Sequence, residues 1–248
     1  MPNSQPTKRS GYAIHTLTAS GAVMGMLALQ SIFNGEVRGA LIWLLASQIL
    51  DGLDGPVARR FDVVVSAPRI DGHVLDLVVD YVTCVVVPIA FMIHFKMLPA
   101  HYEIALAGLT FLFSALWFSR TDLETEDSWF NGFPAAWNLA VPTLYVAHAT
   151  PTQVAVVIFV LSISQLTTFQ FPHIVKAEWM RKVTLPFGIL YLFDIAYISV
   201  TYSDVEGIQL NAITGGILFG FPLYAFIIGT IRTLRIRASE KSESLVQA

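Results

Sequence analysis

Four aspartates occur in two short stretches of an otherwise apolar chain, at spacings that bring carboxylates together. Asp51 and Asp54 are three residues apart, and Asp76 and Asp80 are four apart, so each pair shares one helix face. Clustered like charges at a membrane repel one another and are costly to desolvate, which indicates a bound divalent cation. Ligation by oxygen alone favours Mg²⁺ or Mn²⁺ over Zn²⁺. A single pair would be compatible with a structural role, but four aspartates in this register predict a metal site.

Small residues continue the two aspartate faces. Gly55 and Ala58 follow Asp54 on the first segment, and Gly72 precedes Asp76 by one turn on the second. Glycine lets a bulky ligand approach the backbone closely. A divalent cation beside such a groove is suited to a diphosphate, because it bridges phosphate oxygens and neutralises charge during an in-line displacement. The pattern therefore predicts a phosphoryl-transfer site.

The composition places this site in a membrane protein. Of 248 residues, 54% are hydrophobic and only 13% are charged, with a mean hydropathy of +0.61, whereas soluble domains carry about 25% charged residues. Apolar stretches long enough to cross a bilayer recur along the chain. We expect an all-α integral membrane protein, a polytopic bundle of about eight transmembrane helices, with six or seven not excluded. The expected helices span residues 13–33, 38–58, 72–95, 103–119, 133–149, 151–171, 184–203 and 209–231.

The basic residues indicate the orientation of the bundle. With the N-terminus inside, only Arg38 and Lys96 of the 15 Lys and Arg residues fall on the outer side, and cytoplasmic loops are the ones enriched in these residues. We therefore expect one catalytic domain over 1–248, with cytosolic tails at 1–12 and 238–248, the latter polar and frayed. The one cysteine, Cys84, excludes an intramolecular disulfide. No nucleotide-binding glycine motif occurs, and nothing in the sequence indicates nucleic-acid binding.

The pattern D-x-x-D-G-x-x-A-R … G-x-x-x-D-x-x-x-D resembles the signature of the CDP-alcohol phosphotransferases. Every signature position is filled, by Asp51, Asp54, Gly55, Ala58, Arg59, Gly72, Asp76 and Asp80. The loop between Arg59 and Gly72 is longer than in most of that family. The resemblance implies a six-helix core within the bundle, a homodimer and a CDP-linked lipid as substrate.

The resemblance also implies roles for individual residues. Asp51, Asp54 and Asp76 would hold the metal and the diphosphate. Asp80 would ligate metal or act as general base on the incoming hydroxyl. The small residues Gly55, Ala58 and Gly72 would border the cytidine, and Arg59 would pair with carboxylates or phosphates.

Two further segments, 72–83 and 124–138, and the long loop resemble the bacterial phosphatidylcholine synthases of that family. These transfer the phosphatidyl group of CDP-diacylglycerol to choline and release CMP, so the resemblance implies a bacterial inner membrane. A quaternary ammonium is recognised by aromatic faces and carboxylates. We therefore expect choline-binding residues among Tyr81, Glu126, Trp129 and Trp137, although aromatic residues also serve as interface anchors.

Two alternatives remain at this stage. The acceptor could be serine, glycerol-3-phosphate or an inositol phosphate, although an anionic acceptor would favour Arg and Lys over the acidic loop around Glu126. In a different functional class, the aspartates could form the ion site of an ion-coupled transporter. That interpretation leaves the glycines unexplained, and no internal repeat supports it.

Overall fold

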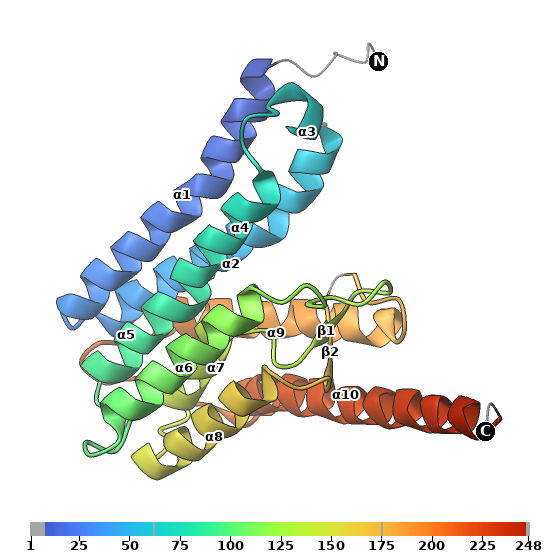
Figure 1. Ribbon diagram of the computed structural model, residues 1–248. Coiled ribbons are helices and arrows are strands. Elements are labelled where there is room, and N and C mark those ends of the chain that lie inside the picture. The colour runs from blue at the N-terminus through green and yellow to red at the C-terminus, as the bar shows by residue number, and fades with distance from the viewer. Residues whose placement is uncertain (1–7, 62, 175, 247–248) are drawn as a thin grey trace.

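The computed structural model describes residues 8–61, 63–174 and 176–246, and it is helical over most of this length (Figure 1). The tail residues 1–7 and 247–248 lie outside the described part. The helices are α1 (Lys8–Phe33), α2 (Val37–Arg60), α3 (Val63–Ser66), α4 (Gly72–Asp80), the π-helical η1 (Tyr81–Val86), α5 (Val87–His94), α6 (Glu103–Phe118), α7 (Trp137–Val146), α8 (Pro151–Ser164), α9 (Arg181–Thr201) and α10 (Ala212–Val246).

The two aspartate-bearing helices lie against α1. In Figure 1, α1, α2 and the run from α4 to α5 stand side by side, at an angle to α9 and α10. Two glycines on α1 allow this approach: a Cβ on Gly21 would meet the Val79 side chain at 2.7 Å, and one on Gly25 would meet Val82 at 3.0 Å. Small residues commonly permit close helix packing in membranes. The glycines of α1 therefore bring α4 and η1 into place.

The segment predicted as one helix over 72–95 is continuous over residues 72–94 but contains a π-helical turn. This turn, η1, begins directly after Asp80, and Pro88 lies in the first turn of α5 beyond it. Proline has no N–H to donate, so the carbonyl four residues earlier loses its helical partner, and a wider turn accommodates the break. The π-turn therefore lies between the Asp80 end of α4 and the buried helix α5.

Two predicted helices are shorter than expected. The segments predicted at 133–149 and 151–171 form α7 at Trp137–Val146 and α8 at Pro151–Ser164. Gly132 and Ala135 have φ values of 81° and 50°, which end any helix there. The flanking residues instead form the antiparallel pair β1 (Trp129–Asn131) and β2 (Gln170–Pro172), with Phe130 opposite Phe171.

Length and apolar composition separate candidate membrane-crossing helices from shorter apolar helices. Among the described residues, four helices are long and apolar enough, at Arg9–Phe33, Gly72–His94, Arg181–Thr201 and Ala212–Ser239, with α6 and α8 as shorter apolar helices. The 10 residues of α7 reach about 15 Å at about 1.5 Å per residue, against a hydrocarbon core of about 30 Å. The chain is a polytopic, all-α membrane protein in which α7 is too short to cross alone.

The C-terminal segment differs from the frayed tail expected there. Helix α10 continues through the polar segment after residue 238 and ends at Val246, and α1 already begins at Lys8. In Figure 1, the end of α10 projects beyond the other helices. The expectation of a frayed 238–248 tail was therefore wrong for residues 238–246.

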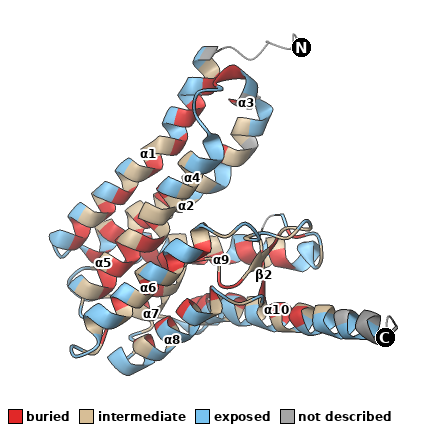
Figure 2. Ribbon diagram, in the orientation of Figure 1, coloured by how far each residue is buried: buried red, intermediate tan, exposed pale blue. Residues whose placement is uncertain are grey.

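The main core lies where α1, α2, α5 and α7 meet, and Figure 2 shows buried residues gathered there. Phe91, Ile89 and Trp137 in this core are fully buried. Large apolar side chains are exposed on the outer faces, among them Ile104 on α6 and Phe193 on α9. Apolar surface facing outward suits helices surrounded by lipid.

Candidate metal and nucleotide site

Three of the four predicted aspartates converge. Asp51 near the end of α2 and Asp76 and Asp80 on α4 each offer a carboxylate oxygen, and these oxygens lie within 4.8 Å of one another. All three residues are half-buried. Three anionic oxygens this close repel strongly unless a cation lies among them. The donor set is all oxygen, which fits Mg²⁺ or Mn²⁺.

Asp54 lies beside this group rather than in it. Its residue is 7% exposed, and it is close enough to Asp51 and Asp76 to interact electrostatically with both. It lines a large pocket next to the cluster. Asp54 is not among the three aspartates whose oxygens lie within 4.8 Å of one another, and its share in the cation stays a prediction.

The pocket has a volume of about 930 Å³ and is bounded by α1, the end of α2, the loop after α3 and the start of α4. Asp76 belongs both to this pocket and to the carboxylate cluster. The predicted small residues and the arginine border it as expected. Its lining residues are Ile14, His15, Thr18, Asp54, Gly55, Ala58, Arg59, Val63, Pro68, Arg69, Ile70, Asp71, Gly72, His73 and Asp76.

The two signature glycines, Gly72 and Gly55, are needed for different reasons. A Cβ on Gly72 would meet Cε1 of His15 at 3.1 Å, so the imidazole on α1 already fills that side. A Cβ on Gly55 would meet only the guanidinium of Arg59, at 3.4 Å. Gly72 is therefore required by the packing of α4 against α1, whereas Gly55 keeps part of the pocket wall open.

Local hydrogen bonds fix the start of α4. The Asp71 carboxylate accepts from the backbone N–H groups of His73 at 3.0 Å and Val74 at 3.2 Å. An aspartate N-cap satisfies N–H groups that have no partner within the helix. Asp76 and Asp80 are thus held on a helix whose first turn is anchored at the pocket edge.

The aromatic residues predicted for choline do not form one pocket. Trp137 is fully buried in the main core, and its indole N–H donates to Ser114 Oγ at 2.9 Å. Trp129 is fully buried in a separate small core beside Trp179, at 5.6 Å between ring centroids. Tyr81 is half-buried, with its hydroxyl on the carbonyl of Phe111 at 3.2 Å, and Glu126 is exposed.

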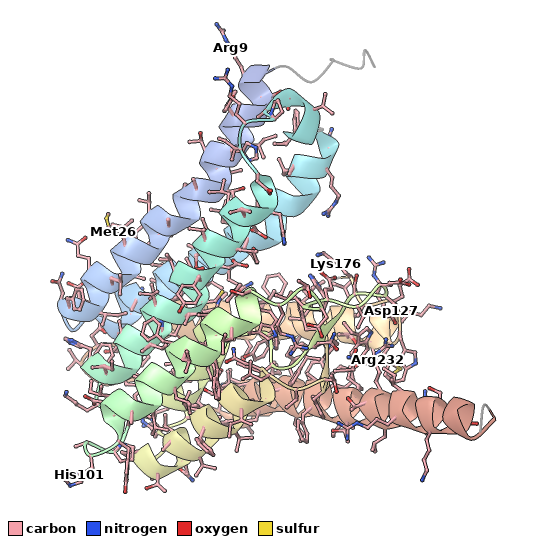
Figure 3. All side chains as sticks on the ribbon, in the orientation of Figure 1. Arg9, Met26, His101, Asp127, Lys176 and Arg232 are labelled. Atoms are coloured by element: carbon pink, nitrogen blue, oxygen red, sulfur yellow. The ribbon has the colours of Figure 1, made fainter. Side chains whose placement is uncertain are left out.

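The face of Trp129 already carries a cation. The guanidinium carbon of Arg232 lies 4.6 Å from the centroid of the indole, and both Asp127 oxygens accept from Arg232 Nη2 at 2.7 and 2.8 Å. Figure 3 shows Asp127 and Arg232 approaching each other from the loop and from α10. Burial alone would raise the pKa of Asp127, but the hydrogen bonds from Thr125 and Arg232 outweigh it and hold that pKa below its usual value.

Sequence reasoning missed several residues of the site. His15 and Thr18 are 6% and 8% exposed and line the pocket from α1. Their three-residue spacing places them on one helix face, which is the only signal in the sequence. Arg69 lines the pocket from the long loop, and in the sequence it is one of the basic residues that indicate only the orientation of the bundle.

Comparison with known proteins assigns the family. Residues 15–190 match the family model described as CDP-alcohol phosphatidyltransferase. A phosphatidylcholine synthase of Pseudomonas aeruginosa is 32% identical over 187 residues, 75% of this chain and 79% of the relative. One from Borreliella burgdorferi is 32% identical over 179 residues, 72% and 76% of the two chains. One from Rhizobium johnstonii is 29% identical over 221 residues, 85% and 91% of the two chains.

The matched range includes most of α1, both aspartate segments and all but one of the residues that line the pocket. This chain belongs to the CDP-alcohol phosphatidyltransferase family.

Proposed function

We propose that the protein transfers the phosphatidyl group of CDP-diacylglycerol to choline, giving phosphatidylcholine and CMP. The observation that carries the proposal is the junction at Asp76, which borders both a pocket of about 930 Å³ and a cluster of three carboxylates. A nucleotide diphosphate needs both features, a cavity for the nucleoside and an acidic metal site for the phosphates. The naming of several bacterial relatives as phosphatidylcholine synthases supports choline as the acceptor.

The metal would be held by Asp51, Asp76 and Asp80, with Asp54 facing the nucleotide pocket. The close carboxylate oxygens support Mn²⁺ or Mg²⁺ rather than a softer ion. When bound, such a cation supplies neutralisation of charge on the diphosphate oxygens.

The chain's own residues bind and orient the substrate. Gly55, Ala58 and Gly72 border the pocket proposed for the cytidine, and Gly55 keeps part of its wall open. Arg59 and Arg69 line the same pocket, and no carboxylate within the described ranges forms a salt bridge with either. Two guanidinium groups available at a phosphate site supply charge-assisted hydrogen bonds.

Asp80 is the proposed general base. It accepts the proton of the choline hydroxyl while that oxygen forms a bond to the phosphorus carrying the diacylglycerol. The bond from that phosphorus to the CMP oxygen breaks, and CMP leaves toward the cytosol. Positioning and proton removal are needed because an alcohol is a poor nucleophile near neutral pH.

For the acceptor, the proposal keeps Tyr81 and Glu126, which retain accessible surface. Trp137 and Trp129 are assigned instead to packing, because both are fully buried and the Trp129 ring has Arg232 on its face. A cation already stacked on an indole leaves that face closed to choline.

The proposal includes the assembly and its orientation. The single catalytic domain has both termini in the cytosol of a bacterial inner membrane, supported by the placement of 13 of the 15 Lys and Arg residues. The homodimer implied by the family resemblance is tested by measuring the mass of the protein in nanodiscs.

The test is an acceptor panel. Purified protein in detergent receives CDP-diacylglycerol, Mn²⁺ and labelled choline, with serine, glycerol-3-phosphate and inositol phosphate in parallel reactions. We expect labelled phosphatidylcholine and an equal amount of CMP with choline alone. Transfer to a different alcohol would discard choline and keep the chemistry. Ion flux in proteoliposomes without any CMP release would instead favour the transporter.

A further inference from the structure

Two amide side chains, the half-buried Gln48 and the buried Asn138, connect the metal cluster to α7. Gln48 Nε2 donates to Asp51 Oδ2 at 3.5 Å from one helical turn away on α2. On the other side, Asn138 Nδ2 donates to Gln48 Oε1 at 2.5 Å, across 90 residues of sequence. The three side chains form a line from the first turn of α7 to the carboxylate cluster.

The chemistry of the chain fixes the direction of both amides. An ionised carboxylate only accepts hydrogen bonds, so Gln48 must present its NH₂ group to Asp51 and its oxygen to Asn138. Asn138 must then donate to that oxygen. Rotating either amide by half a turn would set two oxygens against each other, next to Asp51 in one case.

Asn138 does not satisfy its own hydrogen-bonding capacity. The residue is 5% exposed, and its Oδ1 is buried with no partner among the described residues. A buried amide with one end unsatisfied is unfavourable, so the side chain is explained only by what its other end does. That other end holds Gln48.

The start of α7 is built to keep Asn138 in this place. The neighbouring Trp137 is fully buried and donates to Ser114 Oγ at 2.9 Å, and Ser114 also accepts from Gln165 Nε2 at 3.2 Å. A Cβ on Gly132 would run into the carbonyl oxygen of Gln165, so the loop before α7 packs directly on the end of α8. The donor to Gln48 thus belongs to a rigid junction of α6, α7 and α8.

We propose that Gln48 and Asn138 are positioning residues that orient the Asp51 carboxylate for the metal of the proposed reaction. Residues that orient a metal ligand by hydrogen bonding typically change metal affinity or activity by about 10- to 100-fold when replaced. The inference rests on the proposed metal site and adds α7 to the elements that build it.

The test measures Mn²⁺ binding to the full chain in detergent without substrate. The amount of free Mn²⁺ is read from its electron paramagnetic resonance signal. Gln48→Met and Asn138→Leu are each expected to weaken binding by about 10- to 100-fold. The double variant is expected to lose no more Mn²⁺ affinity than the single variant that binds Mn²⁺ less tightly. Both changes break the same connection, so their effects do not add. Activity at saturating Mn²⁺ should recover in the variants, which separates metal positioning from catalysis.

Thr143→Val is the matched control. The Thr143 hydroxyl lies 3.4 Å from the Tyr191 hydroxyl, so this change also removes a polar contact between α7 and another helix. It should leave Mn²⁺ affinity unchanged. If Thr143→Val weakens Mn²⁺ as much as Asn138→Leu, the pair only holds helices together and the inference is overturned.

A more conservative variant keeps the test valid if Gln48→Met or Asn138→Leu fails to fold. Gln48→Asn keeps an amide but is one methylene shorter, so it cannot reach both partners and should weaken Mn²⁺ binding likewise. Unchanged Mn²⁺ affinity in folded Gln48→Asn, Gln48→Met or Asn138→Leu would contradict the inference while leaving the proposed function intact. Absence of Mn²⁺ binding by the wild-type chain would overturn the metal site itself.

Discussion

Arg232 on α10 stacks on Trp129 at 4.6 Å and is held there by both oxygens of Asp127. A quaternary ammonium also binds to an aromatic face beside a carboxylate, so Trp129 and Asp127 have the chemistry expected of a choline site. The cation it binds, however, comes from the protein itself. Asp127 and Trp129 therefore bind Arg232 and hold α10 against β1 and the acidic loop before it.

Trp129→Phe should lower stability without changing choline recognition. The smaller ring leaves a void in a fully buried site and weakens the contact with Arg232, and complete truncation to Ala would cost about 3–5 kcal/mol. Thermal unfolding and the KM for choline measure the two effects separately. Asp127→Asn should shift unfolding in the same direction, because it loosens Arg232. If Trp129→Phe raised the KM for choline and left the unfolding temperature unchanged, Trp129 would belong to the acceptor site.

Asp80→Asn should abolish turnover and largely keep binding of CDP-diacylglycerol. Loss of a general base costs about 100- to 10,000-fold in rate, while the pocket lining does not include Asp80. Single-turnover CMP release and equilibrium binding of the lipid substrate are the measurements. Asp122→Asn is the control, since Asp122 pairs with Arg120 at 2.8 Å and belongs to neither the pocket nor the cluster. Turnover near the wild-type rate in Asp80→Asn would remove it as base.

Gly72→Ala should weaken CDP-diacylglycerol binding through His15. The new Cβ would lie 3.1 Å from the imidazole, which would have to shift within the pocket that it lines. Gly52→Ala is the control on the other aspartate helix, because nothing lies within 4 Å of its Cβ; it should gain about 0.5–1 kcal/mol of helix stability. Adding His15→Ala to Gly72→Ala should bring the KM for CDP-diacylglycerol part of the way back to the wild-type value. Equal effects of the two glycine changes would show that the His15 contact is unimportant.

The loop residue His173 should make stability depend on pH. Burial, and then the charge of Lys176, lower the pKa of His173 from 6.5 to about 4. Between these values the unfolded chain binds the extra proton, so stability is full above pH 6.5 and falls as the pH drops toward about 4. Thermal unfolding across this range should show a shallower dependence in His173→Gln. Identical curves for the two proteins would rule out this contribution.

Spacing along single helices made part of the site predictable. Asp76 and Asp80 share a face of α4, and Asp51 joins them because α2 and α4 both pack on α1. The helical segments were also predictable, since apolar length marks them. Helix ends were not predictable at Gly132 and Ala135, where backbone conformation set by packing against α8 overrides the apolar pattern.

Contacts between distant segments were outside the reach of sequence reasoning. The bond from Asn138 to Gln48 spans 90 residues, and that from Arg232 to Asp127 spans 105. Both join side chains whose local sequence also fits an ordinary helix or loop. Periodicity indicates which face of a helix is buried but not which residue of another helix it meets.

The most direct test of the account is CMP release by purified protein treated with EDTA and then supplied with CDP-diacylglycerol, choline and Mn²⁺. We expect release only when choline and Mn²⁺ are both present, and none from folded Asp76→Asn, because Asp76 joins the nucleotide pocket to the carboxylate cluster. Equal release without added metal, or from Asp76→Asn at the wild-type rate, would contradict the account.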